Sequence, residues 1–447
     1  MQHLVQYQIR GSGSSQIASS IEQGVRAGGL GPGTRLPTVR TLAARLGVSP
    51  TTVAAAYRGL QARGLLFARG RRGTRVAFRP PVAGLATARP EAPPRGRPLR
   101  NVADGNPDPA LLPPLRPALA RLPTRPRLYG EPTHSPELLA LAERQLGADG
   151  IPTEAVAIVA GALDGIERVL QAHLRPGDRV AVEDPGYAGV LDLVPALGLA
   201  AEPMAVDDSG PLPQELARAL RAGAKAVILT PRAQNPTGAA LDEPRGRALR
   251  AVLDRHQGAL LIEDDHAGPV AGARALSLAA GGRDSWAVVR SVSKSLGPDL
   301  RLAFLAGDAT TVARVEGRQR LGSGWVSHLL QGIVANLLSA EGTHGLLAEA
   351  TRRYAERRAA LIAALGALGI GAHGRSGMNV WVPVPEELGT VQRLADRGWA
   401  VRGGERYRLR SPPALRITIA RLRPEDARRL AADVARCLAP EARSRPA

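Results

Sequence analysis

The sequence predicts an α/β protein in two parts: a small basic helical head and a large body built around a mainly parallel sheet. Its 447 residues exceed what one hydrophobic core usually organises. Positive charge is concentrated at the start, where residues 1–78 hold eleven arginines against one acidic residue, Glu22. Beyond residue 100, apolar runs of strand length alternate with helical patterns, as they do in parallel α/β sheets.

The uneven charge favours a nucleic-acid-binding head on a nearly neutral body. Residues 79–100 add five arginines and Glu91, so the rest of the chain carries only +5 of the net charge of +19. No apolar window reaches 18 residues and the N-terminus lacks the apolar stretch of a signal peptide, so we expect a cytoplasmic protein. The single cysteine, Cys437, permits neither an internal disulfide nor a cysteine metal cluster.

Capping signals and the spacing of apolar residues predict three helices in the head. The first ends at a glycine pair. The second opens at Pro37 and Thr38 and stops at Gly47, and the third has Ser49 as N-cap and Pro50 in its first turn. Their apolar positions are, in chain order, Ile17, Ile21 and Val25; Val39, Leu42, Ala43 and Leu46; and Val53, Ala56, Tyr57 and Leu60. The second and third helices therefore form a helix-turn-helix, whose third helix reads DNA.

The start of the third helix carries the predicted base and phosphate contacts. Ser49, Thr51 and Thr52 place short hydroxyls beside free backbone N–H groups, which suit phosphate and base edges. Arg35 and Arg40 would flank them on the DNA backbone. We therefore expect double-stranded DNA as the partner of the head.

The stretch LLFARGRRGTRVAF predicts two short strands around an arginine-rich turn, which is the form of a wing. Arg69, Arg71 and Arg72 would reach phosphates or a narrow minor groove. Residues 14–78 resemble the winged helix-turn-helix of GntR-type bacterial regulators, through GLGPGTRLPTVRTLAARLGVSPTTV and RGRRGTRV. Pro50 stands where that family often has an arginine, which puts one expected DNA contact in doubt.

A linker is predicted between head and body. Residues 79–100 are rich in proline and arginine and have neither helical nor strand periodicity, so we expect an extended, semi-rigid segment. The predicted domains are thus a winged helix-turn-helix domain at 1–78, this linker, and a cofactor-binding body at 101–447.

Five apolar runs in the body predict buried strands: AVAIVAG, DRVAVEDP, AKAVILTP, GALLIEDDH and SWAVVRSVS. Polar residues cluster just after them, and open α/β sheets bind ligands at the carboxyl ends of their strands. One of these residues is Lys294, which with Lys225 makes up all the lysine of an arginine-rich chain. Lysine, unlike arginine, can lose its proton and form Schiff bases with carbonyl compounds. Lys225 has no such setting, and we interpret it as structural.

The polar residues at the strand ends meet the requirements of pyridoxal 5'-phosphate. This cofactor needs a lysine for its aldehyde, an acid at its pyridine nitrogen, a donor to its phenolic oxygen, a stacking aromatic ring and an anion cradle. The candidates are, in that order, Lys294; Asp264 or Asp265; Asn235; Tyr187; and Gly161 and Ala162 at a helix N-terminus with Ser291 and Arg301. Adjacent strand residues face opposite ways, so the two aspartates stay alternatives, with Asp264 preferred.

Residues 101–436 resemble the fold-type I aminotransferases, whose landmarks match EDPGY, QNPTG, EDDH and SVSKSLGPDLRLAF. The resemblance implies that Lys294 is the Schiff-base lysine, that Asn235 binds the phenolic oxygen and that Tyr187 stacks on the ring. It implies that Arg301 binds the phosphate together with Gly161, Ala162 and Leu163, and that Ser291 and Ser293 contact the cofactor. It also implies that Tyr129 reaches the phosphate of a neighbouring subunit and that Arg416 binds a substrate's α-carboxylate. It also implies the corresponding fold, with a mainly parallel sheet.

Three positions depart from that family's pattern. His266 replaces a tyrosine that bonds the cofactor's oxygen, and His134 stands near the site entrance where glycine is usual. Leu163 takes a position that is commonly polar in the phosphate cup. These departures favour cofactor binding over efficient transamination.

A GntR-type head joined by a long linker to an aminotransferase-like body is the architecture of the MocR subfamily of bacterial transcriptional regulators. The resemblance implies a head-to-tail homodimer that binds operator DNA and senses pyridoxal 5'-phosphate, or an amine or amino acid forming a Schiff base with it. One alternative is a working aminotransferase that moves an amino group between an amino acid and a 2-oxo acid. Another is a DNA-binding repressor whose body holds no cofactor.

Overall fold

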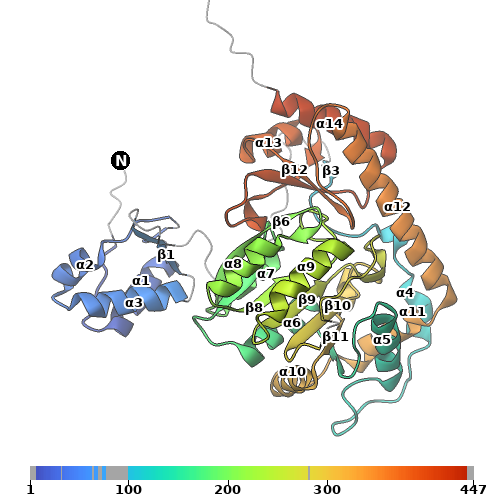
Figure 1. The fold of residues 1–447 in the computed structure, drawn as a ribbon, viewed down its shortest axis with the longest axis horizontal. Helices are drawn as coiled ribbons and strands as arrows, with labels where there is room; N and C mark the ends of the chain where they lie inside the picture. Colours follow the sequence, from blue (N-terminus) through green and yellow to red (C-terminus); the bar gives the residue numbers. More distant parts are fainter. Residues whose placement is uncertain are drawn as a thin grey trace, which may run out of the picture. The chain divides into compact units, whose positions relative to one another are not determined.

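A computed structural model describes residues 7–31, 33–62, 65–68, 73–76, 99–279 and 282–439 (Figure 1). Arg69, Arg71 and Arg72 of the predicted wing turn lie outside the described residues, as does the predicted linker up to residue 98. Among the helices of the described ranges, none is long and apolar enough to cross a membrane.

The head has the three predicted helices followed by a two-stranded wing. They are α1 (Ser14–Arg26), α2 (Val39–Leu46), α3 (Pro50–Ala62), β1 (Leu66–Ala68) and β2 (Thr74–Val76). The predicted caps form as expected: Thr38 accepts a hydrogen bond from the N–H of Thr41, and Gly47 ends α2 with a left-handed φ of 65°. β1 and β2 pair antiparallel. The apolar faces of the three helices meet in one small core.

The body is built on an eight-stranded sheet in the order β4-β11-β10-β9-β8-β5-β6-β7. Its strands are β4 (Val156–Val159), β5 (Arg179–Asp184), β6 (Ala200–Asp207), β7 (Gly210–Pro211), β8 (Ala224–Leu229), β9 (Leu260–Asp265), β10 (Trp286–Ser291) and β11 (Ala303–Gly307). Each of the five apolar runs is a strand, as predicted. β8, β9 and β10 are parallel neighbours, whereas β11 runs antiparallel to β10 and β4.

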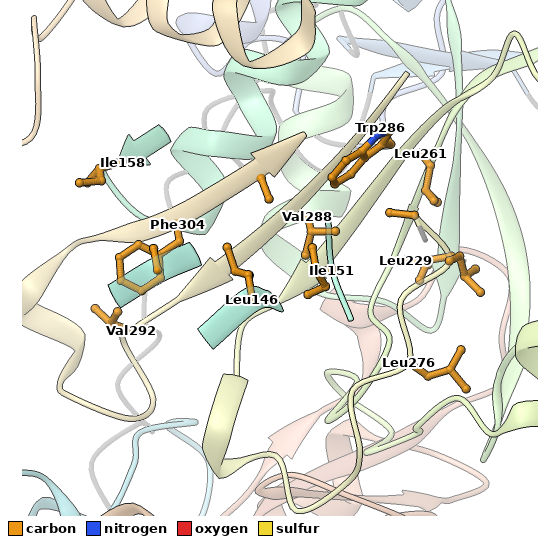
Figure 2. Close-up of a cluster of buried hydrophobic side chains, with 14 of the residues drawn as sticks. Leu146, Ile151, Ile158, Leu229, Leu261, Leu276, Trp286, Val288, Val292 and Phe304 are labelled. Carbon is orange, nitrogen blue, oxygen red and sulfur yellow. The ribbon is translucent and has the colours of Figure 1, made fainter. Parts of the chain in front are cut away.

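Helices pack around this sheet (Figure 1). They are α4 (Leu115–Ala120), α5 (Pro136–Ala148), α6 (Ala162–His173), α7 (Ala188–Ala196), α8 (Pro213–Arg221), α9 (Glu243–Asp254), α10 (Ala309–Leu321) and α11 (His328–Leu338). Figure 2 shows the buried side chains on which the sheet rests, including Ile158 of β4, Leu261 of β9, Val288 of β10 and Phe304 of β11. Because this core is apolar and closely packed, it fixes the positions of the polar residues at the strand ends.

A smaller antiparallel sheet forms the C-terminal part of the body, in the order β12-β15-β14. Its elements are β12 (Asn379–Pro383), β14 (Arg402–Gly403) and β15 (Ala414–Thr418), with helices α12 (Glu341–Gly366), α13 (Leu388–Asp396) and α14 (Pro424–Leu438). Next to it, β13 (Trp399–Ala400) pairs parallel with β3 (Arg100–Asn101), which begins at the last residue of the predicted linker. The first strand of the body is therefore hydrogen-bonded to its C-terminal part.

Candidate cofactor and effector site

The predicted site residues gather where the parallel strands of the large sheet end. Asp264 lies at the end of β9 and Lys294 three residues after β10, while Tyr187 and Asn235 follow β5 and β8. Parallel strands present their carboxyl ends at the same edge of a sheet, so residues far apart in sequence become neighbours there.

The amine of Lys294 lies among groups that favour its neutral form. Its Nζ donates a hydrogen bond to the main-chain oxygen of Gly105 at 2.7 Å. Burial, and then the positive charge of Arg416, lower the pKa of Lys294 to about 8, against the opposing charge of Asp104. A free lysine has a pKa of about 10.4, so far more of this amine is unprotonated near neutral pH. The other lysine, Lys225, is exposed on β8.

The two adjacent aspartates of β9 have different surroundings. Asp265 accepts hydrogen bonds from Arg232 and Arg290 at 2.7–2.9 Å, and these guanidinium groups hold its pKa well below the usual range. Asp264 has a buried oxygen with no hydrogen-bond partner among the described residues. Burial, and then the charges of Asp265 and Glu183, raise the pKa of Asp264 to about 7. An orphaned buried carboxylate oxygen fits the protonated ring nitrogen of pyridoxal 5'-phosphate.

An anion cradle lies at the start of α6. Gly161 directly precedes this helix with a φ of 103°, and a Cβ there would come within 2.9 Å of Nη2 of Arg301. The positive φ favours glycine at this position, and α6 begins directly after it with Ala162 and Leu163, whose N–H groups belong to the first helical turn. Arg301 is itself held at a positive φ of 41°, a conformation that is costly for arginine.

Two serines after β10 are linked to each other. The hydroxyl of Ser291 lies 3.0 Å from that of Ser293 and accepts a hydrogen bond from the N–H of Ser293. This contact gives the loop before Lys294 a fixed turn, with both hydroxyl groups on it.

The ring residues Tyr187 and His266 are uncharged in this environment. Burial, and then the negative charge of Asp264, raise the pKa of Tyr187, while Arg301 and Arg416 oppose that rise. Burial and the charge of Lys294 lower the pKa of His266 to about 4. His266 is therefore a neutral imidazole at pH 7, next to the amine.

Asn235 and Arg416 are in contact. The Oδ1 of Asn235 lies 3.4 Å from both Nη1 of Arg416 and Nδ2 of Asn379, so its own Nδ2 remains available as a donor. Arg416 also donates to the main-chain oxygen of Ala103 and places its guanidinium 5.0 Å from the centre of the Tyr407 ring. Its Nε is buried without a partner in the described part of the chain. Arg416 therefore keeps a hydrogen-bond donor for a ligand.

Two predicted residues lie elsewhere. Tyr129 is 92% exposed and packs edge-to-face on Trp325, with ring centres 5.7 Å apart, so it contacts no site residue of its own chain. His134 pairs with Glu316 through Nε2 at 3.1 Å, and its Nδ1 is buried without a partner among the residues described.

Some site residues were missed by the sequence interpretation. The main-chain oxygen of Ala103 accepts a hydrogen bond from Arg416, and that of Gly105 accepts one from Lys294. The ring of Tyr407 packs against the guanidinium of Arg416. The segment DGN at 104–106 has the composition of a turn, but nothing in it indicates which side chains would donate to it.

The predicted DNA contacts of the head are surface residues. Ser49 accepts a hydrogen bond from the N–H of Thr52 at 3.1 Å, and its hydroxyl lies within 2.8 Å of those of Thr51 and Thr52. Arg35 and Arg40 are exposed. The first turn of α3 therefore presents three hydroxyl groups to its surroundings.

Residues 14–76 match the gntR family of bacterial regulatory proteins, and residues 99–434 match the aminotransferase class I and II family. The vitamin B6 salvage pathway transcriptional repressor PtsJ of Salmonella typhimurium is 42% identical over 433 residues, covering 96% of this chain and 99% of that protein. The regulator TauR of Rhodobacter capsulatus is 32% identical, covering 85% and 86%. The probable rhizopine catabolism regulatory protein MocR of Rhizobium meliloti is 28% identical, covering 78% and 76%.

Solved aminotransferases share the fold of the body. Kynurenine aminotransferase of Pyrococcus horikoshii superposes with a TM-score of 0.70 at 21% identity, covering 76% of this chain and 91% of that one. The α-aminoadipate aminotransferase LysN of Thermus thermophilus gives 0.68 at 24% identity, covering 76% and 92%.

Proposed function

The chain belongs to the MocR subfamily of GntR-type bacterial regulators, and from that premise we propose a transcriptional regulator whose head binds operator DNA and whose body senses pyridoxal 5'-phosphate or an amine that reacts with it. The observation that carries this proposal is the occurrence, in one body, of a lysine whose pKa is lowered to about 8 and of Asp264, a buried acid with one carboxylate oxygen that has no hydrogen-bond partner among the described residues. We propose the domain boundaries expected from the sequence, with the head at 1–78, the linker at 79–100 and the body at 101–447.

Each site residue has a role toward the cofactor in this proposal. When bound, pyridoxal 5'-phosphate supplies an aldehyde that condenses with primary amines. Lys294 offers its amine, and the carboxylate of Asp264 accepts a hydrogen bond from the protonated ring nitrogen. The start of α6 and the guanidinium of Arg301 hold the phosphate, supported by their contact at Gly161. Asn235 donates its Nδ2 to the phenolic oxygen, because its Oδ1 already faces two donors.

The remaining cofactor contacts follow the same pattern. Tyr187 is close enough to Asp264, Arg301 and Arg416 for their charges to affect its pKa, and we assign it the stacking position on the cofactor ring. Ser291 and Ser293 add hydroxyl donors beside Lys294, and His266 adds a neutral imidazole.

The regulated genes are proposed from the relative PtsJ, which is described as a repressor of vitamin B6 salvage. Identity of 42% over nearly the full length of both chains supports a regulon of the same kind. Repression lifted or strengthened by the cofactor itself would then report cofactor supply. Arg416 additionally lets the site hold an amino acid through its α-carboxylate.

The segment that follows the linker offers a route from ligand to DNA. Lys294 donates to Gly105 and Arg416 to Ala103, so both ligand-binding cations hold one short stretch of main chain. A ligand that engages both cations competes with those two hydrogen bonds. Ligand binding and the position of the linker end are therefore thermodynamically coupled, as regulation requires.

A homodimer is part of the proposal. Large apolar side chains are exposed around the loop before α5 and at α10 and α11: Leu128 67%, Tyr129 92%, Leu321 91% and Leu329 61%. Tyr129 contacts Trp325, and His328 lies 3.0 Å from the oxygen of Pro132, so these segments are neighbours. Exposed apolar surface of this kind marks an interface. In a head-to-tail dimer, Tyr129 would reach the phosphate in the partner's site.

Absorbance titration of the full-length protein with pyridoxal 5'-phosphate, alongside operator binding, tests the function. We expect a visible band in the wild type and in Lys225→Ala, its matched lysine control, and a change in DNA affinity that follows the band. Lys294→Ala should lose both. A cofactor band with no change in DNA binding, together with sustained turnover of an amino acid and a 2-oxo acid, would instead identify an aminotransferase. No band at all would leave a DNA-binding repressor without a cofactor.

A further inference from the structure

Two arginines stand side by side on one face of the small C-terminal sheet. The antiparallel register of β14 and β15 places Arg402 directly opposite Arg416, and the register of β12 and β15 places Trp381 opposite Arg416 on its other side. Directly opposite residues of antiparallel strands project from the same face, with Cβ atoms roughly 5 Å apart. Trp381, Arg416 and Arg402 therefore form one row across three strands.

This row faces the cofactor site. The alternate residues of the same strands, Leu415, Ile417 and Val380, are fully buried in the core formed with α12, α13 and α14. On the other face, Arg416 contacts Asn235, and a Cβ on Gly105 would lie 3.2 Å from its Nη2. Arg402 thus shares a face with the arginine that reaches the ligand site.

The positive charge of this row is not neutralised within the described residues. Arg416 is 5% exposed, yet its partners are an amide oxygen, a main-chain oxygen and an aromatic ring, and neither it nor Arg402 forms an ion pair there. Burial, and to a smaller extent the charge of Arg402, lower the pKa of Arg416, against the opposing effect of Tyr407. Opposed like charges destabilise a sheet, and a buried charge without a counter-ion is costly.

Another arginine pair in the same body shows how such charge is balanced. Arg232 and Arg290 also lie together, but there Asp265 and Asp149 form ion pairs with both of them at 2.6–3.2 Å. Two acids near the row already have arginine partners: Asp104, whose charge acts on Arg416, pairs with Arg421 at 2.8 Å, and Glu387, beside Gly403, pairs with Arg408 at 2.8 Å. An anionic group of a ligand would neutralise the charge of Arg402 and Arg416, as carboxylates of the chain neutralise the other arginine pair.

We propose that Arg402 is a second anion-binding residue of the effector site, and that the effector is an amino acid with a second acidic group. This inference rests on the proposed function: the amine meets the cofactor at Lys294, and the α-carboxylate meets Arg416. Arg402 then binds the second acid. Planar guanidinium groups bind carboxylates in a two-pronged geometry, so two neighbouring arginines suit a dicarboxylate.

The test uses cofactor-loaded, full-length protein titrated with aspartate against asparagine and glutamate against glutamine, followed by the shift of the cofactor band. The members of each pair match in shape and differ in charge. We expect the wild type to bind one acid at least about ten-fold more tightly than its amide. Arg402→Gln should lose that preference and keep its affinity for the amide within about two-fold. Arg410→Gln, the control at an exposed arginine of the same part of the body, should behave as the wild type.

A second measurement examines the protein without ligand. Removing one of two repelling charges should leave the thermal midpoint of Arg402→Gln equal to or above that of the wild type. A clear fall in that midpoint would mean that Arg402 is held by a partner of its own, which would overturn the inference.

The outcomes separate this inference from the proposed function. Suppose that the cofactor band forms and alters DNA binding, but that acids and amides bind equally or that no amino acid of either pair binds. Arg402 then does not bind an acidic group of the effector, and the proposed regulatory function is retained. A preference that survives in Arg402→Gln also overturns the inference. Absence of the cofactor band, in contrast, removes the proposed function itself.

Discussion

Asp264 and Asp265 are adjacent in β9, yet two arginines bind Asp265 while Asp264 keeps a buried oxygen without a partner in the described part of the chain. Side chains alternate across a strand, so the two carboxylates lie on opposite faces. One face supplies Arg232 and Arg290, and the other faces the ligand site. The same residue type thus forms a structural ion pair at one position and is the proposed ligand contact at the next.

Replacing each aspartate by asparagine should separate these roles. Asp265→Asn leaves two buried arginines undercompensated, and we expect it to lower the unfolding free energy of the body by about 3–5 kcal/mol. Asp264→Asn should instead weaken cofactor binding and leave the fold intact. Denaturant unfolding followed by tryptophan fluorescence reads the body alone, since all four tryptophans lie beyond residue 285. Equal losses of stability in both variants would contradict the distinction.

The difference in unfolding free energy between Asp264→Asn and the wild type should depend on pH. The folded-state pKa of Asp264 is about 7 against an unfolded value near 3.9, so the folded body binds more protons between these values. The contribution of Asp264 to stability is therefore lost as pH rises through about 7. Without cofactor, the asparagine variant should gain stability relative to the wild type by on the order of 4 kcal/mol as pH rises from 4 to 8. A pH-independent difference between the two proteins would refute the assignment.

Cofactor capture by Lys294 should rise with pH. The neutral amine is the reactive form, and its pKa is lowered to about 8, so the rate of band formation should reach half its maximum near pH 8. Arg416→Gln removes the positive charge that helps to lower this pKa, and should move the midpoint to higher pH. Stopped-flow absorbance across pH 6–10 measures both, with Lys225→Ala as the unchanged control. A midpoint near 10.4 in the wild type would show that the amine is not perturbed.

Assembly should depend on the apolar surface beside Tyr129. Leu329→Arg places a charge among the exposed apolar side chains proposed as the dimer face, and we expect the dissociation constant to rise by about a hundred-fold. Leu388→Arg is the matched control, because Leu388 is 81% exposed on α13, a different part of the body. Sedimentation equilibrium distinguishes the two. Similar dissociation of both variants, or of neither, would place the interface elsewhere.

In the head, Arg40→Ala should weaken operator binding and random-sequence binding alike, and should reduce the salt dependence of affinity by about one phosphate contact. Thr51→Ala should affect the operator more than random DNA, because Thr51 lies in the first turn of the helix that reads bases. Arg274→Ala, an 86% exposed arginine of the body, serves as control. Fluorescence anisotropy at several salt concentrations provides the data. An unchanged salt slope in Arg40→Ala would mean that this side chain does not contact phosphate.

Much of this architecture is predictable because its signals are local. Thr38, Gly47 and Ser49 cap their helices through neighbouring backbone groups, and these caps form as predicted. The strand runs are recognisable because both faces of the sheet are covered, which demands continuous apolar residues. Lys294 stands out because arginine cannot replace an amine that must lose its proton.

What the sequence leaves open depends on contacts between distant segments. The apolar run at 303–307 does not reveal that β11 is antiparallel to its neighbours, since both directions bury the same side chains. The difference between Asp264 and Asp265 arises from arginines 25 or more residues away. Arg402 and Arg416 become neighbours only through strand register, and no spacing along the chain indicates it.

The hydrogen bond from Lys294 to Gly105 also indicates which mutations would abolish the regulator's response to its effector. Gly105 has a φ of 72°, and any side chain there would press on the guanidinium of Arg416. Because Arg416 is the proposed contact of the effector's α-carboxylate, a side chain that displaces this guanidinium should weaken the response to the effector. A reporter screen for regulators that ignore their effector should therefore recover substitutions at position 105, outside both the DNA-binding head and the cofactor's own contacts.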